Sequence, residues 1–178
     1  AVELAAAIAL GVLVTMFVLP RLAPPAAVVE GTPLVDLRLA EVNRIDLTRV
    51  QGGRRSVRLE RDAGGPWLLV GAEGTEPVPD DRVVELLDAV AGARVVVDLE
   101  GGAEELGELG LEDPAGELTL HRINAEPVRI VLGDRNPTLT GLYVQVFPGG
   151  RLAMVGSVLL WEVDKLAALA TAQPPESS

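Results

Sequence analysis

Two kinds of hydrophobic pattern divide this chain. Residues 2–19 form one apolar run in which Glu3 is the only charged residue. A helix over this run extends roughly 27 Å at about 1.5 Å of rise per residue, which is near the thickness of a bilayer's hydrocarbon core. Its backbone groups pair within the helix, as a lipid environment requires. We therefore expect residues 1–20 to be a single transmembrane anchor in the lipid bilayer.

A cleaved signal peptide is the alternative interpretation of this run. Signal peptides usually begin with a basic segment, have an apolar core of about 7–15 residues and end at a small-x-small cleavage site. Here the charged residue before the run is acidic, and prolines crowd the small residues at 23–27. These differences favour an anchor, and the sequence leaves cleavage open.

The apolar run carries a stripe of small side chains, because Ala7, Gly11 and Thr15 recur every four residues. Such stripes let transmembrane helices approach closely. We interpret these residues as a packing face for a partner helix, although an alanine-rich composition accounts for the stripe equally well.

Beyond residue 34 the hydrophobic period is mostly two, which is typical of β-strands. Alternation on both sides of the turn at 51–54 predicts a hairpin of strands 45–50 and 56–60. Further strands are expected at 67–70, 94–99, 117–122, 142–147 and 151–155, with a short helical turn at 104–109. The domain so defined covers residues 34–170, between a stiff proline-rich linker at 21–33 and a disordered tail at 171–178.

Two segments have helical spacing instead. Asp80 is the expected N-cap of a helix that continues to about Ala91, and Ser157 is the expected N-cap of a last helix. The apolar faces are Val83, Val84, Leu87, Val90 and Ala91 in the first helix, and Leu159, Leu160, Val163, Leu166 and Ala167 in the second.

The two halves of the domain resemble each other. Residues 46–48 and 57–59 have counterparts at 117–119 and 128–130, so both pairs are offset by 71 residues. We interpret this as two ββ(β)α units. The expected fold class is α+β, with an antiparallel sheet and helices on one side.

The composition of the chain excludes some classes of partner and of chemistry. The formal net charge is −11, and no basic stripe offsets it, so we expect no nucleic-acid partner. The chain has no cysteine, which excludes disulfides and thiolate chemistry. Lys165 is the single lysine among fifteen basic residues, and this bias is typical of a GC-rich bacterial genome.

Candidate catalytic groups lack the partners that their chemistry needs. His121 is the only histidine, and it shares a strand face with Glu117 and Thr119, which indicates a solvated position. The acidic residues between 98 and 113 match no calcium-loop spacing, and Ser157 lacks the second glycine of a nucleophile elbow. We therefore expect no catalytic, metal-binding or cofactor-binding residue, and no enzymatic activity.

The two tryptophans are the remaining candidates. Trp67 on a strand and Trp161 on a helix are each interpreted as core residues, and Trp161 has a second interpretation as an exposed anchor in a partner interface.

A series of short motifs resembles the bacterial domain family DUF4340. The motifs are Ile45-Asp46-Leu47-Thr48, Val57 to Arg61, Gly65-Pro66-Trp67, Val83 to Val90, Leu109 to Pro114, Leu132-Gly133-Asp134 and Tyr143. Together they cover roughly residues 42–170. The resemblance implies an N-terminal membrane helix and an auxiliary role beside membrane transporters, and it implies no catalytic residues. This chain carries one such domain, whereas the transporter-associated relatives carry more.

The sequence thus favours a non-catalytic, single-span accessory subunit of a larger membrane protein complex, either a transporter or an energy-transducing respiratory or photosynthetic assembly. The expected location is the bacterial inner membrane with a periplasmic domain, although Arg21 after the apolar run weakly favours the opposite orientation. The alternative is an envelope domain that binds a small ligand or peptide, such as an ABC-transporter auxiliary protein, and it predicts a concave apolar pocket.

Overall fold

A computed structural model describes residues 31–72, 74–99 and 105–170. The predicted anchor with Ala7, Gly11 and Thr15, most of the predicted linker, and the predicted tail lie outside the described residues. Among those that are described, no helix is both long and apolar enough to cross a bilayer.

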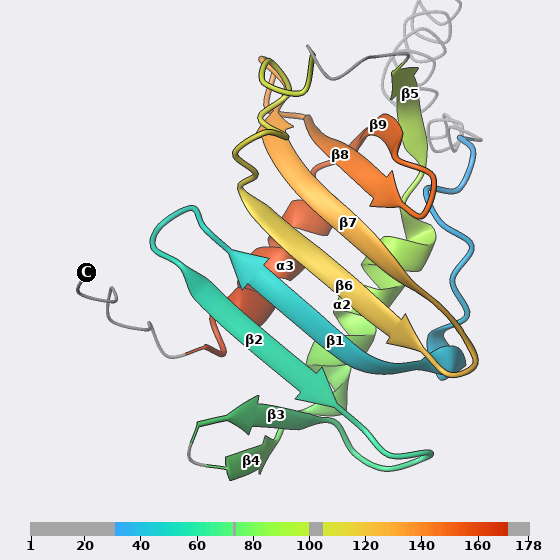
Figure 1. The fold of residues 1–178 in the computed structure, drawn as a ribbon, viewed down its shortest axis with the longest axis vertical. Coiled ribbons are helices and arrows are strands. Elements are labelled where there is room, and N and C mark those ends of the chain that lie inside the picture. The colour runs from blue at the N-terminus through green and yellow to red at the C-terminus, as the bar shows by residue number, and fades with distance from the viewer. Residues whose placement is uncertain (1–30, 73, 100–104, 171–178) are drawn as a thin grey trace, which may run out of the picture. The chain divides into compact units, whose positions relative to one another are not determined.

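The described residues form one antiparallel sheet of nine strands, in the order β4-β3-β2-β1-β6-β7-β8-β9-β5 (Figure 1). A short 3-10 turn, η2 (Leu39–Glu41), precedes the first strand. The strands are β1 (Val42–Arg49), β2 (Arg55–Glu60), β3 (Leu68–Gly71), β4 (Gly74–Pro77), β5 (Val95–Leu99), β6 (Gly116–Arg122), β7 (Ala125–Arg135), β8 (Gly141–Phe147) and β9 (Arg151–Gly156).

Two helices, α2 (Asp80–Gly92) and α3 (Val158–Ala167), pack against each other on the same face of this sheet (Figure 1). The main core lies between them and alternate strand residues such as Ile45, Leu118 and Val144, all of which are inaccessible to solvent. An α+β fold with a large antiparallel sheet is therefore confirmed. The predicted apolar face of α3 is also confirmed, since all five of its residues are buried.

The chain traces the same path twice, and each repeat has four strands before its helix instead of the predicted two or three. β1 to β4 run outward from the centre of the sheet and lead into α2, and β6 to β9 run outward in the opposite direction and lead into α3. The 71-residue offset maps the central β1–β6 ladder onto itself, since the pair Ile45–Leu120 becomes the pair Gly116–Arg49. The next ladders do not match under this offset. Val57 pairs with Leu47, and the offset makes Val128 and Leu118 their counterparts. Leu118 pairs with Ile130 instead.

Several sequence predictions are wrong in detail. Asp80 is the first helical residue rather than the N-cap, and its Oδ1 accepts a hydrogen bond from the backbone N–H of Trp67 at 3.4 Å. Val84 is exposed, whereas Leu86 faces the core. Ser157 occupies the N-cap position of α3 without capping it, because its hydroxyl donates to the Thr140 carbonyl.

Strand β4 lacks the signal that identifies strands in a sequence. All four of its residues are exposed, so no alternation of apolar and polar positions marks it, and the sequence predicts only a turn there. Its formation depends on hydrogen bonding to β3.

A second, smaller cluster covers part of the sheet's other face. Val131 alternates with Ile130 and Leu132, so its side chain points away from the helices and packs with Leu111 and Leu152. The turn at 105–111 lies over this cluster through a hydrogen bond from the Asp134 N–H to the Leu109 carbonyl. A Cβ at residue 133 would collide with that carbonyl oxygen, which explains the glycine there.

Candidate functional site

The outward side of α3 carries the most exposed large apolar residues of the described chain. Trp161 is 67% exposed and Val158 is 63% exposed. They lie three residues apart on one helix, so their side chains are neighbours on the same face. We call this pair the α3 surface.

A buried arginine fixes α3 against the sheet. Arg49 at the end of β1 is only 6% exposed at its side chain, and its Nε donates to Asp164 of α3 at 2.7 Å. Its two other nitrogens donate to the Ala115 carbonyl and the Gln51 side chain. Every buried side-chain polar atom among the described residues has a partner, so this attachment leaves nothing unsatisfied.

Charged residues border the α3 surface. One turn further along the helix, Lys165 lies 2.8 Å from Glu162 and 3.5 Å from Glu85 of α2. At the other end, Leu139 is exposed and has a positive φ of 60°, which costs energy for a leucine. The neighbouring Thr140 carbonyl accepts hydrogen bonds from Ser157. Apolar residues within a polar rim are the usual anatomy of a protein interface.

Trp67 has the opposite environment. Its side chain is 2% exposed and belongs to the main core, and the Arg61 guanidinium stacks 4.7 Å from its ring centroid. Of the two interpretations offered for the tryptophans, burial therefore applies to Trp67, while exposure applies to Trp161.

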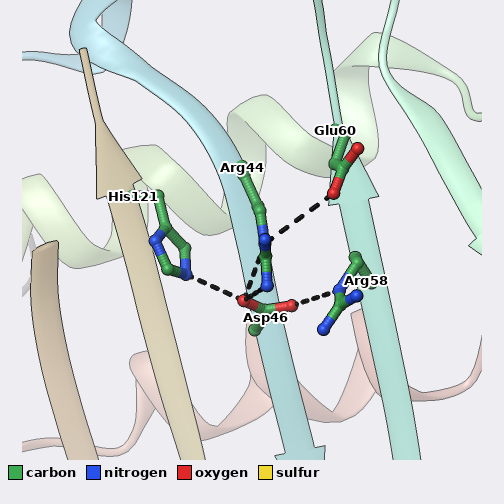
Figure 2. A network of polar contacts seen from close by, with 5 residues as sticks. All are labelled: Arg44, Asp46, Arg58, Glu60 and His121. Atoms are coloured by element: carbon green, nitrogen blue, oxygen red, sulfur yellow. Dashed lines mark hydrogen bonds and ion pairs between the residues drawn. The ribbon is translucent and has the colours of Figure 1, made fainter.

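A polar network occupies the sheet face opposite the helices (Figure 2). Asp46 of β1 lies at its centre and accepts hydrogen bonds from Arg44 at 2.9 Å, from Arg58 at 2.7 Å and from Nε2 of His121 at 2.8 Å. Arg44 also lies 3.8 Å from Glu60. The network thereby connects β1, β2 and β6.

The charges of this network stabilise one another. Burial raises the pKa of the Asp46 carboxyl, but the hydrogen bonds from Arg44, Arg58 and His121 outweigh it, so the pKa lies below its ordinary value of 3.8. The hydrogen bond to Asp46 raises the pKa of Arg58 in turn. Asp46 is consequently ionised at neutral pH.

Comparisons were made with family models, with curated proteins and with solved structures. None of them matches this chain. The resemblance to DUF4340 therefore stays a prediction, and the functional argument depends on the geometry of the described residues.

That geometry favours a structural role for the Asp46 network. A His–Asp pair serves in catalysis when the histidine also contacts a nucleophile. In the described part of the chain, Asp46 is the one side chain hydrogen-bonded to His121. Two arginines share the same carboxylate, and this arrangement is typical of a network that joins strands.

Within residues 31–72, 74–99 and 105–170, a surface recess of about 690 Å³ lies beside β2 and β3. A smaller one of about 270 Å³ lies beneath Leu139 and Leu160. No group of three or more carboxylate or histidine side chains in these ranges is arranged to hold a metal ion.

The contact between His121 and Asp46 was missed by sequence reasoning. The two residues are 75 positions apart, and their contact depends on the β1–β6 pairing. The 71-residue offset contains a signal for this contact. It marks β1 and β6 as equivalent strands, and antiparallel pairing of the two about their midpoint places Asp46 and His121 at neighbouring positions on one face.

Proposed function

We propose that this chain is a non-catalytic, single-span accessory subunit of a larger bacterial membrane protein complex. Its anchor lies in the inner membrane, and its acidic domain docks on the complex outside the membrane, on the periplasmic side. The host is a transporter or an energy-transducing assembly. The α3 surface is the docking face.

The exposure of Trp161 is the observation that carries this proposal. Tryptophan is enriched among the residues that contribute most to binding at interfaces, and neighbouring apolar contacts exclude water around it. Val158 supplies such a neighbour one turn away. In the free domain both side chains lie in water. Exposed apolar surface costs free energy, and a partner that covers it removes this cost.

The rigidity of α3 also supports docking. A partner gains more from a preorganised surface, because less conformational entropy is lost on binding. The Arg49–Asp164 ion pair and the five buried apolar residues of α3 supply that rigidity.

Native electrophoresis of membranes solubilised in mild detergent tests the proposal. We expect the wild-type chain to migrate in a large assembly and the Trp161→Ala variant to migrate at its own mass. Val96→Ala is the matched control, because Val96 is also an exposed apolar residue but lies on the edge strand β5. A wild-type chain that migrates alone contradicts the proposal.

We also propose that the two halves of the domain descend from one duplicated unit of four strands and a helix. The symmetry of the β1–β6 ladder under the 71-residue offset supports this. Residues 42–92 expressed alone are then expected to form a homodimer through β1. A folded monomer contradicts the expectation that a second β1 can take the place of β6 in the central ladder.

A further inference from the structure

The end of β1 and the start of β6 lie at the same end of the sheet (Figure 1), and a surface recess of about 370 Å³ is found there. Thr48 of β1 and Glu117 of β6, which are paired across the two strands, both line it. Thr48 lies two residues from Asp46, so both side chains project from the sheet face opposite the helices. Small-molecule sites in proteins have volumes of about 300–1,000 Å³. We call this space the β1–β6 recess.

Hydrogen bonds to one carbonyl group hold the walls of the recess together. The backbone N–H of Val50 donates to the Ala115 carbonyl at 2.9 Å, and the buried Arg49 side chain donates to the same oxygen. These bonds fix the turn at 50–54 against residues 113–116. A recess with fixed walls loses little conformational entropy when a ligand binds.

Opposite charges line the recess without neutralising each other. Arg54 lies in the turn before β2, Asp113 lies before β6, and Glu117 lies within β6. Among the described residues, neither Arg54 nor Asp113 forms an ion pair. Glu117 contacts Arg129 at 3.4 Å through its Oε2 atom. The recess therefore offers both a guanidinium and carboxylate oxygens to a molecule that enters it.

A ligand that suits these groups carries both charges itself. A guanidinium binds a carboxylate through two parallel hydrogen bonds, and carboxylates accept hydrogen bonds from an ammonium group. A ligand with one charge would satisfy one side of the recess and bring a like charge toward the other. Val50, which is 49% exposed, and Pro114 add apolar surface. A free α-amino acid combines a carboxylate, an ammonium group and a side chain in one small molecule.

We infer that the β1–β6 recess binds a free α-amino acid with an apolar side chain. Arg54 holds the carboxylate of the ligand, and Asp113 and Glu117 hold its ammonium group. The side chain of the ligand contacts Val50. This inference goes beyond the proposed docking through α3, because the recess lies on the other face of the sheet and does not require Trp161.

NMR of the ¹⁵N-labelled full chain in detergent micelles tests the inference, with L-leucine as the probe. Two matched probes each lack one charge: 4-methylpentanoate has no ammonium group, and 3-methylbutylamine has no carboxylate. We expect L-leucine to shift the amide signals of Val50, Arg54 and Gly116 in a saturable way. Each matched probe is expected to bind about 3- to 10-fold more weakly, because one charged hydrogen-bonded contact is lost at a partly exposed site.

Two substitutions assign the charges of the ligand to the two sides of the recess. Arg54→Gln is expected to weaken L-leucine binding about 3- to 10-fold and to leave 3-methylbutylamine binding unchanged. Asp113→Asn is expected to weaken L-leucine binding similarly and to leave 4-methylpentanoate binding unchanged. Arg55→Gln and Glu112→Gln are the matched controls, because these neighbours carry the same charges but do not line the recess. Both controls are expected to bind L-leucine within about twofold of wild type.

Three results would overturn the inference: no saturable shift at the solubility limit of L-leucine, equal binding of the three probes, or equal effects of Arg54→Gln and Arg55→Gln. Stronger binding of glycylleucine than of L-leucine would identify a peptide as the occupant, and would likewise overturn binding of a free amino acid. The Arg54→Gln variant is expected to migrate as wild type does in native electrophoresis. Failure here is therefore distinguishable from failure of the proposed function.

Discussion

The two halves of the sheet follow the same path but differ at their outer elements. In the half formed by β6–β9, each strand pairs with the next over five or more residue pairs, and the tryptophan of the half, Trp161, lies in solvent on α3. In the half formed by β1–β4, Trp67 is buried, while β3 leaves β2 after two pairs. The comparison teaches that one topology supports two kinds of exposed surface. One is an apolar helix face, and the other is an open strand edge.

The tryptophans provide the largest contrast between the halves. Trp67→Ala is expected to lower the free energy of unfolding by about 3–5 kcal/mol, because it removes a buried aromatic side chain and leaves a cavity. Trp161→Ala is expected to change it by less than about 0.5 kcal/mol, since that side chain is exposed. Urea unfolding followed by circular dichroism measures both. Similar losses in the two variants would contradict the difference between the halves.

A glycine in the second half gives the next effect. Gly133→Ala is expected to cost about 1–3 kcal/mol, because the added Cβ collides with the Leu109 carbonyl oxygen and displaces the turn at 105–111. Gly156→Ala on β9 is the control, since a Cβ there meets open space, and a change below about 0.5 kcal/mol is expected. Thermal unfolding of both variants decides whether this turn packs on the sheet as described.

The ion pair that joins the halves, between Arg49 of β1 and Asp164 of α3, gives a smaller effect. Asp164→Asn leaves the buried Arg49 guanidinium without its anion, and we expect a loss of about 1–2 kcal/mol, moderated by the half-exposed position of Asp164. Glu41→Gln removes an exposed ion pair with Arg38 and is expected to cost less than about 0.5 kcal/mol. Equal effects in urea unfolding would show that the buried arginine does not fix α3.

The smallest effect concerns pH. The folded state holds the pKa of Asp46 below 3.8, so the stability that its ionised form supplies is complete above about pH 5 and is lost as the pH falls through the folded-state pKa. The difference in unfolding free energy between wild type and Asp46→Asn is therefore expected to be constant from pH 7 to about pH 5 and to shrink below about pH 4. A difference that persists unchanged at pH 2 would refute the ion-pair account of this network.

Local sequence patterns predicted much of this fold, whereas the features that depend on long-range strand pairing were not predicted. The strands at 142–147 and 151–155 and the buried face of α3 follow from periodicity, which each segment carries by itself. The exposed strand β4 and the divergence of β3 from β2 depend on neighbours distant in the sequence, so no local pattern reveals them.

The candidate site was only partly visible in the sequence. Trp161 was recognised as a candidate because tryptophan is rare in this chain and enriched in interfaces. Its exposure follows from the helical spacing of α3, because Trp161 is not among the apolar residues that form the buried face. The Asp46–His121 contact, by contrast, required the central strand pairing.

Site-specific photo-cross-linking in intact cells tests the central claim most directly. A photoreactive phenylalanine derivative replaces Trp161 in one strain and the exposed Arg82 on α2 in a control strain. The account predicts that position 161 forms a cross-link to one membrane protein of the host complex and that position 82 forms none to that protein. An uncross-linked chain at position 161, or equal cross-linking at both positions, would contradict docking through α3.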